Sequence, residues 1–149
     1  MHPNTALYDE DFFAWCTATA ALIRGGKWQE IDPEALAEEI DSLGKSQRRE
    51  LEHRLEVLLT HLLKWRYQPE RRDDSHSWSD TIFEQRNQLR RLLRDNPSLR
   101  PHIAVLLPDI YRDAVRRAAG VTRLLASVFQ STCPWTIANI LEADFWPAD

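Results

Sequence analysis

PEALAEEIDSLGKSQRRELEHRLEVLLTHLLKW, residues 33–65, is the stretch that decides the fold. Its apolar side chains recur mostly in steps of three and four, and Gln47 is the only polar residue on the stripe. This spacing keeps one face of an α-helix apolar and does not suit a strand, in which side chains alternate with a period of two. We therefore predict one long central helix whose apolar stripe consists of Leu36, Ile40, Leu43, Leu51, Leu55, Leu58, Leu62 and Trp65.

The two ends of this predicted helix differ in character. Asp32 is placed to cap its start, and Pro33 occupies the first turn, where a missing N–H costs nothing. Its last third, residues 55–63, is apolar nearly all round, which is typical of a helix enclosed by several neighbours. Gly44 is the weak point, because glycine costs about 1 kcal/mol relative to alanine inside a helix. We expect the helix to continue through Gly44, with a bend or a break as the alternatives.

Helical spacing also recurs on both sides of the central stretch. Before it, we predict a helix from Asp9 to about Arg24, with the Thr19 hydroxyl bonded back to the Trp15 carbonyl. The inward residues of this helix are Phe12, Trp15, Cys16, Leu22 and Ile23. After it, a third helix starts near Ser77 or Ser79. Its inward residues are Trp78, Ile82, Gln85, Leu89 and Leu92, and its outward residues are Arg86, Arg90, Arg91 and Arg94.

A fourth helical pattern runs from Leu99 to Val128. Pro108 lies inside it and removes one backbone hydrogen bond, so we expect a kink or a restart near Leu107. The segment Ser131–Pro134 then opens a short terminal helix. Because no stretch alternates with the period of a strand, we predict an all-α fold: one domain, residues 1–149, formed by a bundle of about four main helices plus the short C-terminal one.

Charge and cysteine content restrict the class of protein. The net charge is −4, but residues 1–41 carry nine acidic and two basic residues, a net charge of −7, and the remainder carries +3. This asymmetry either helps a partner or a second copy to associate, or simply reflects acidic residues at helix N-termini. The two cysteines match no zinc-site spacing, and no signal peptide or membrane span is recognisable. We expect a soluble, cytoplasmic protein.

Several motifs occur in a familiar order. They are Tyr8-Asp9-Glu10-Asp11-Phe12, Leu36-Ala37-Glu38-Glu39-Ile40, Ser42-Leu43-Gly44, Arg48-Arg49-Glu50-Leu51, His61-Leu62-Leu63-Lys64-Trp65, Gln68-Pro69, Trp78, Thr81-Ile82, Glu84-Gln85-Arg86, Asn96-Pro97-Ser98-Leu99, Cys133-Pro134-Trp135-Thr136, Ile140-Leu141 and Phe145-Trp146-Pro147. Over nearly the whole chain this set resembles the bacterial domain of unknown function family twenty-nine. The resemblance implies an all-helical fold and supplies no activity, catalytic residue, cofactor or ligand.

Arg54 and His61 are the candidate catalytic residues. Seven residues apart on one helix, they lie within about 20° of each other around the axis. An Arg-x6-His pair falls within the spacing used by helical HEPN-type RNases, with the histidine as acid or base and the arginine steadying phosphate charge. The alternative is structural: His61 bonds a backbone or carboxylate group at the edge of the core, and Arg54 forms an ion pair. Arg48 and His53 also fit the spacing but face apart.

Other constellations are weaker. Glu50 and His53 form one Glu-x-x-His motif, but di-iron bundles use two copies and His76 lies in a connector, so we predict no metal and no cofactor. Cys133 precedes a helix start that can depress the pKa of a thiol, yet no histidine is nearby in sequence, so packing is the alternative. Exposed tryptophans, of which Trp28, Trp135 and Trp146 are the candidates, indicate a partner surface, whereas buried ones belong to the core.

The hypotheses for function come from different classes. The first is a non-enzymatic helical module that binds another protein or itself through helix faces. The second is an RNA-binding or RNA-cleaving bundle that uses Arg54, His61 and the arginines of the third helix, where acidic residues are interspersed. A metal-dependent bundle enzyme is a distant third. A polar pocket containing both Arg54 and His61 favours the second, and an exposed apolar patch without such a pocket favours the first.

Overall fold

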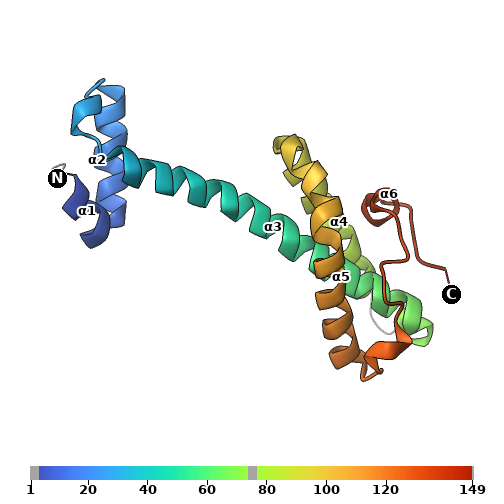
Figure 1. The fold of residues 1–149 in the computed structure, drawn as a ribbon. Helices are drawn as coiled ribbons and strands as arrows, with labels where there is room; N and C mark the ends of the chain where they lie inside the picture. The colour runs from blue at the N-terminus through green and yellow to red at the C-terminus, as the bar shows by residue number, and fades with distance from the viewer. Residues whose placement is uncertain (1–3, 74–76, 149) are drawn as a thin grey trace. The chain divides into compact units, whose positions relative to one another are not determined.

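The computed structural model describes residues 4–73 and 77–148. Within these ranges the chain contains six α-helices and no strand, which confirms the predicted all-α fold (Figure 1). The α-helices are α1 (Thr5–Glu10), α2 (Phe12–Arg24), α3 (Pro33–Tyr67), α4 (Ser77–Asp95), α5 (Arg100–Thr122) and α6 (Ile137–Leu141). Short 3-10 helices lie at η1 (Trp28–Glu30), η2 (Pro69–Arg71), η3 (Pro97–Leu99) and η4 (Ala126–Val128).

Backbone contacts divide the chain into two compact units, residues 1–46 and 47–149. Helix α3 contributes to both, and it runs without interruption from Pro33 to Tyr67. The predicted long central helix and its continuity at Gly44 are therefore confirmed. A Cβ added at Gly44 meets no atom within 4 Å, so the packing of the chain itself does not require glycine there. The prediction of a single domain over residues 1–149 stays a prediction.

The first unit begins with two helices where the sequence predicted one. Helix α1 ends at Glu10, and Asp11 caps α2 by accepting a hydrogen bond from the Ala14 backbone N–H at 3.0 Å. The backbone of Asp11 lies outside the helical region (φ −148°, ψ 88°), so it separates the two helices, which lie side by side in Figure 1. Asp11, and not Asp9, is therefore the cap of the helix that ends at Arg24.

The inward face of α2 also differs from the prediction. Trp15 and Thr19 are buried, but Phe12 and Cys16 are exposed. Helix α1 packs against the Trp15 side of α2, where the Tyr8 and Trp15 ring centroids are 4.7 Å apart, and Tyr8 reaches Phe12 only at the edge of this contact, with 6.0 Å between ring centroids. The Thr19 hydroxyl accepts a hydrogen bond from the Asn4 amide at 2.6 Å, in place of the predicted bond to the Trp15 carbonyl.

The start of α3 matches its prediction. The Asp32 carboxylate accepts hydrogen bonds from the backbone N–H groups of Glu34 at 3.1 Å and Ala35 at 3.3 Å, as an N-cap does. The hydroxyl of Thr5 donates to the same carboxylate at 3.1 Å, and the Tyr8 hydroxyl donates to Glu39. These bonds join α1 to the beginning of α3 within the first unit.

The apolar stripe of α3 is covered over only part of its length. Leu51, Leu55, Leu58 and Leu62 are fully buried, but Ile40 is 60% and Leu43 is 68% exposed. The prediction of a continuous buried stripe is therefore wrong for its first half. In the first unit, Ala35 is the last buried residue of α3. Glu39, which accepts from the Tyr8 hydroxyl, is half-buried, and every residue from Ile40 to Ser46 is exposed.

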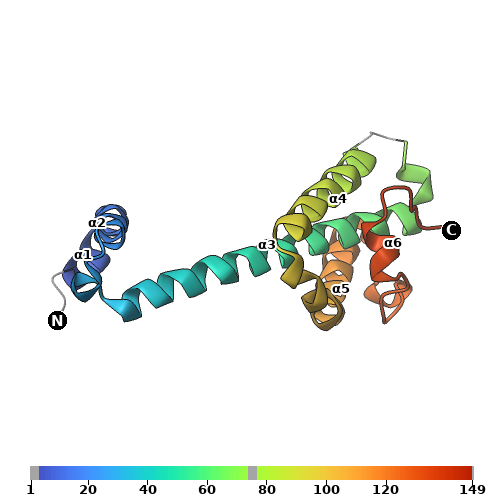
Figure 2. The same ribbon diagram turned by 90° about the horizontal axis from the view of Figure 1, so that it is seen from above.

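In the second unit, the C-terminal half of α3 passes between α4 and α5 (Figure 2). The leucines of α3 are enclosed on all sides there, as the all-round apolar pattern predicted. Because the burial of apolar surface is the dominant favourable contribution to folding, this cluster is the main source of stability in the unit. Its buried members are Leu51, Leu55, Leu58, Leu59, Leu62, Leu63, Ile82, Leu89, Leu92, Leu93, Ile103, Ile110, Tyr111, Ala114, Ala118, Phe129 and Ile140.

Helix α5 is continuous through Pro108, so the alternative of a restart near Leu107 is wrong. It ends earlier than the apolar pattern predicted. Arg123 adopts a left-handed conformation (φ 61°), which stops the helix after Thr122. The apolar residues beyond this point form no helical stripe, and Leu125 is 74% exposed.

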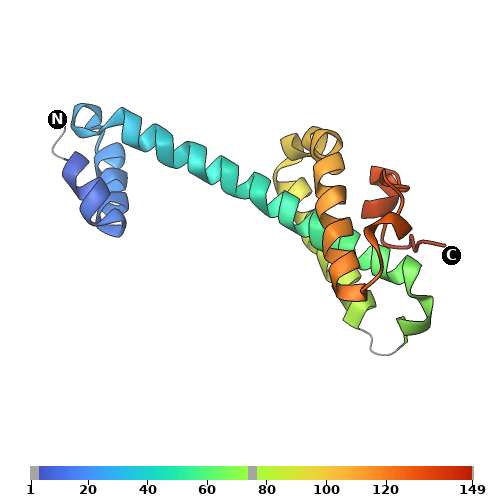
Figure 3. The same ribbon diagram turned by 60° about the horizontal axis from the view of Figure 1, so that its bottom comes forward.

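The C-terminal segment returns to the end of α3 (Figure 3). Helix α6 begins at Ile137, after the predicted opening at residues 131–134, because the Thr136 hydroxyl is the cap and accepts from the Asn139 N–H at 3.1 Å. The Trp65 and Trp146 ring centroids are 4.4 Å apart, and the Arg66 guanidinium donates to the Ala148 carbonyl. No helix of the described residues is long and apolar enough to cross a membrane.

Candidate functional site

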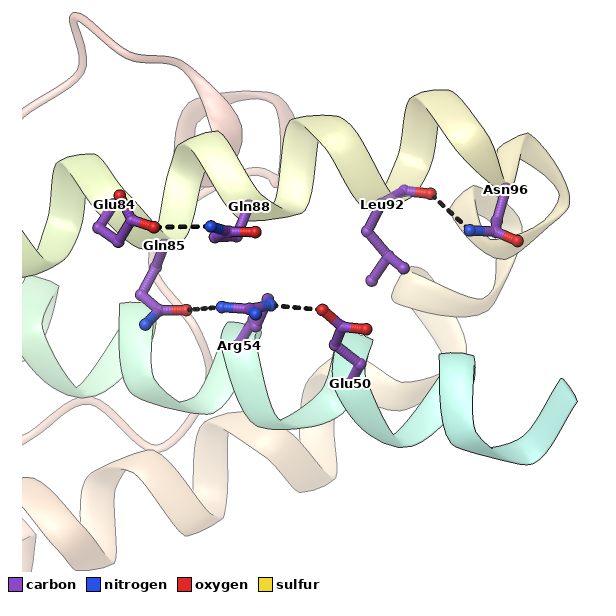
Figure 4. Close-up of polar contacts among 7 residues, drawn as sticks. All are labelled: Glu50, Arg54, Glu84, Gln85, Gln88, Leu92 and Asn96. Carbon is purple, nitrogen blue, oxygen red and sulfur yellow. Dashed lines mark hydrogen bonds and ion pairs between the residues drawn. The ribbon is translucent and has the colours of Figure 1, made fainter. Parts of the chain in front are cut away.

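Arg54 lies on the side of α3 that faces α4 (Figure 4). Its Nε donates to the Glu50 carboxylate at 2.9 Å, and one terminal nitrogen donates to the side-chain oxygen of Gln85 at 3.3 Å. The first bond is an ion pair one turn apart on α3, and the second joins α3 to α4. Arg54 therefore links two helices of the second unit, and both of its contacts are to side chains of the chain itself.

His61 is half-buried, two turns further along α3. Its Nδ1 lies 2.8 Å from the Val57 carbonyl oxygen, so Nδ1 carries the hydrogen and Nε2 is the free acceptor of the neutral ring. Burial lowers the pKa of His61 below its ordinary value of 6.5, and the positive charges of Lys64 and Arg117 lower it further, against the opposing effect of the Val57 bond. The ring is thus neutral at pH 7.

The structure gives Arg54 and His61 separate partners. No hydrogen bond among the described residues joins them. His61 adjoins Lys64 and Arg117, and Arg117 pairs with Glu56 at 3.5 Å. Catalysis of RNA cleavage by the Arg54–His61 pair stays a prediction.

The environment of His61 predicts a pH-dependent stability. Since the pKa is lower in the folded state, the unfolded chain binds the proton first as the pH falls below 6.5, and stability is lost from there towards the folded pKa. We expect His61→Gln to reduce the fall in the free energy of unfolding between about pH 7.5 and about pH 5.5. Urea unfolding at each pH, followed by circular dichroism, measures this free energy of unfolding. His102→Gln, on an exposed site of α5, is the control; an equal pH dependence in both variants would contradict the prediction.

The two residues of the Glu-x-x-His motif, Glu50 and His53, have different neighbours. Glu50 pairs with Arg54, whereas His53 is exposed and lines a hollow of about 490 Å³ between α3 and α5. The hollow is also lined by Glu52, Glu56, Asp109 and Asp113, together with Arg48 and Arg49. No group of three or more metal-ligating side chains in the described part of the chain is arranged to hold a metal ion. His76, which the sequence places in a connector and not in a second motif, lies outside the described residues.

Cys133 has the surroundings of a packed thiol. Its Sγ donates to the Trp135 carbonyl at 3.5 Å, and burial raises the pKa of the thiol, while that bond lowers it. Helix α6 begins only at Ile137, so Cys133 does not lie at the helix N-terminus that was expected to depress its pKa. Of the candidate tryptophans, Trp28 and Trp146 are exposed and Trp135 is half-buried.

Arg86 is the residue that the sequence analysis misplaced. It was predicted to face outward on α4, but it is only 2% exposed. Its Nε donates to the Ile140 carbonyl at 2.9 Å, and its terminal nitrogens donate to the carbonyls of Ala143 at 3.4 Å and Asn139 at 3.5 Å. The last carbonyls of a helix have no partner within it, and this guanidinium supplies one for the end of α6.

A signal for the burial of Arg86 is present in the sequence. Arg86 lies four residues after Ile82 and three before Leu89, both fully buried, so it falls on the apolar stripe of α4. A charged residue on such a stripe is buried only where polar groups compensate it. Its guanidinium also lies over the Trp146 ring, 5.8 Å from the centroid, which adds a cation–π contact to the C-terminal segment.

Comparison with known proteins identifies the family of this chain and no individual relative. Neither the curated proteins nor the solved structures include a significant match to this chain. A family model does match, and it covers residues 7–146, which include nearly all of both units. The sequence motifs that suggested this family lie within the matched range, except for Pro147, the last residue of the last motif. The chain therefore belongs to the family described as Domain of unknown function DUF29.

Proposed function

We propose that this protein is a non-enzymatic helical module that associates with a second copy of itself through the exposed N-terminal half of α3. The observation that carries the proposal is the change in burial along one stripe. Leu51 is fully buried, whereas Ile40 and Leu43, on the same stripe, are 60% and 68% exposed. Large apolar side chains that recur on one exposed helix face are typical of a surface that another helix covers.

The spacing of this face suits a second copy of the same helix. Leu36, Ile40, Leu43 and Gln47 follow one another in steps of four, three and four, which is the seam of a coiled coil with one polar position. Two copies present the same seam, so the apolar side chains of each copy cover those of the other. Gly44 flanks the seam, and the open space around it permits a close approach of the two helix backbones.

Charge complementarity also favours a second copy of this chain over a partner that carries no basic segment. Residues 1–41 carry a net charge of −7 and residues 42–149 carry +3. Each copy therefore offers the other an oppositely charged segment, which increases the rate of encounter at low salt and helps to orient the pair. A partner that lacked a basic segment would have no such attraction to the acidic N-terminal segment.

The test is the mass of the protein in solution, measured by sedimentation equilibrium over a wide range of concentration. We expect wild-type protein to reach twice the chain mass of 17.4 kDa and the double variant Ile40→Glu, Leu43→Glu to stay at the single mass. Burying one such side chain contributes about 1.5–3 kcal/mol, and a buried glutamate carboxylate without a partner opposes association. Circular dichroism checks that the variant keeps its helices.

Val105→Glu is the matched control. Val105 is 78% exposed on α5, so the control places the same carboxylate at an exposed apolar site that is not part of the α3 seam. We expect it to associate as the wild type does. A wild-type protein that stays at the single mass at every concentration, or a double variant that associates as well as Val105→Glu, would exclude the proposed seam.

A further inference from the structure

A small cavity of the second unit lies between α4, the start of α5 and the end of α6. Its volume is about 110 Å³, and it is lined by Arg86, Arg90, Arg100, Leu93 and Leu141. At about 30 Å³ for one water molecule, the cavity holds three or four waters or one group of similar size. Its charged lining residues are all arginines, and no acidic residue lines it.

The three arginines that line the cavity differ from six others of the second unit that pair with acidic side chains. Arg48, Arg54, Arg94, Arg112, Arg116 and Arg117 each pair with a carboxylate. Among the described residues, no carboxylate forms an ion pair with Arg86, Arg90 or Arg100. Arg90 donates instead to the neutral side-chain oxygen of Asn87 at 3.1 Å. Three arginines therefore surround the cavity without a direct ion pair in the described part of the chain, and Glu142 is the acidic residue whose charge acts on Arg86 from nearby.

Arg86 is the fixed member of this group. Its three carbonyl bonds to residues 139, 140 and 143 use three of the five N–H donors of a guanidinium, so two donors remain. Burial lowers the pKa of Arg86, and the nearby charge of Glu142 opposes this effect. The ordinary pKa of arginine is so high that the group stays charged. Arg86 is therefore a buried cation that is held in place by three carbonyl groups and forms no direct ion pair with a described residue.

We propose that this cavity binds one tetrahedral oxyanion of the phosphate type, held by Arg86, Arg90 and Arg100. The planar, multiply donating guanidinium is well suited to phosphate oxygens, and three of them around one cavity match the several oxygens of a single phosphate. The buried side chain of Leu93 forms an apolar wall, which lowers the local dielectric and strengthens the attraction. The volume admits the phosphate group and excludes an attached sugar or base, which would lie outside.

The test is isothermal titration calorimetry with inorganic phosphate, with chloride adjusted so that ionic strength stays constant. We expect saturable binding of one phosphate per chain to the wild-type protein. Arg90→Met and Arg100→Met each remove one charged donor and are expected to weaken phosphate binding by about tenfold or more. Arg86 is left unchanged, because it also holds α6 and its replacement would alter the cavity itself.

Arg94→Met is the matched control, since Arg94 is exposed on the same helix and pairs with Asp95 at 3.1 Å. It is expected to bind phosphate as the wild type does. Competition with ribose 5-phosphate identifies the source of the anion: tighter binding of the ester assigns the site to the phosphate of a larger molecule, and weaker binding assigns it to the free ion. Absence of saturable phosphate binding to the wild type, or equal affinity of all three variants, would overturn the proposal.

Discussion

Replacing Arg86 with methionine is expected to lower the free energy of unfolding of the second unit by about 2–3 kcal/mol. The variant removes the donors that the carbonyls of Ile140, Ala143 and Asn139 accept from, and it removes the cation over the Trp146 ring. Methionine keeps most of the apolar stem and relieves the cost of burying a charge, which offsets part of the loss. The net effect is unfavourable because the Ile140 carbonyl stays buried without a donor.

Urea unfolding of this variant and of Arg90→Met measures the effect. Arg90 is exposed one turn further along α4, so the same change there is expected to alter stability by less than about 0.5 kcal/mol. Limited proteolysis gives a second measurement, since release of α6 exposes residues 133–148 to cleavage before the rest of the unit unfolds. If both variants were equally stable and equally resistant to protease, Arg86 would not hold the C-terminal segment.

Replacing Leu58 with alanine is expected to cost about 2–5 kcal/mol, the largest effect of any single substitution considered for this protein. Leu58 is fully buried on α3, where α4 and α5 enclose the helix. Truncation loses the transfer free energy of the side chain and leaves a cavity. Neighbours held on rigid helices close such a cavity only in part, so we expect the upper half of this range.

The matched control for this substitution is Leu125→Ala in the same unit. Leu125 is 74% exposed, so an identical change in side-chain chemistry is expected to alter stability by less than about 0.5 kcal/mol. The midpoint and slope of urea unfolding, followed by circular dichroism, give both values. A loss of similar size at both positions would show that the burial of Leu58 does not determine its contribution.

The sequence was sufficient for those parts of the fold that depend on local patterns. The spacing of leucines from Leu51 to Leu62 predicted both the helix and its enclosure, and the Asp32–Pro33 pair predicted where α3 begins. Patterns of this kind are local, because helical period and capping involve residues only a few positions apart. The continuity of α3 at Gly44 followed from the same argument.

Burial that depends on which element covers a face could not be read from the sequence. Phe12 and Ile40 lie on apolar faces that the rest of their unit covers only in part or not at all, so Phe12 is 49% and Ile40 is 60% exposed. Arg86 is buried because α6, far away in sequence, brings its carbonyls to α4. For the candidate site, spacing placed Arg54 and His61 on one helix. Their bonds to Glu50 and Val57, one turn back on α3, agree with the structural alternative. The Gln85 contact of Arg54 and the Arg117 charge near His61 come from other helices and were not predictable.

The exposed stretch of α3 has a consequence in helix–coil terms. Every residue from Ile40 to Ser46 is exposed, and an isolated peptide of this length would be mostly unfolded, because the first helical turn is costly to form. Here nucleation occurs at the capped start near Asp32 and again in the packed region from Leu51, so the stretch between them only propagates helix that already exists at both sides. The helical order of residues 40–46 therefore depends on the helical segments on both sides of it. Because these residues make few packing contacts, their amide protons are expected to exchange with solvent by local unfolding long before those of the leucine core.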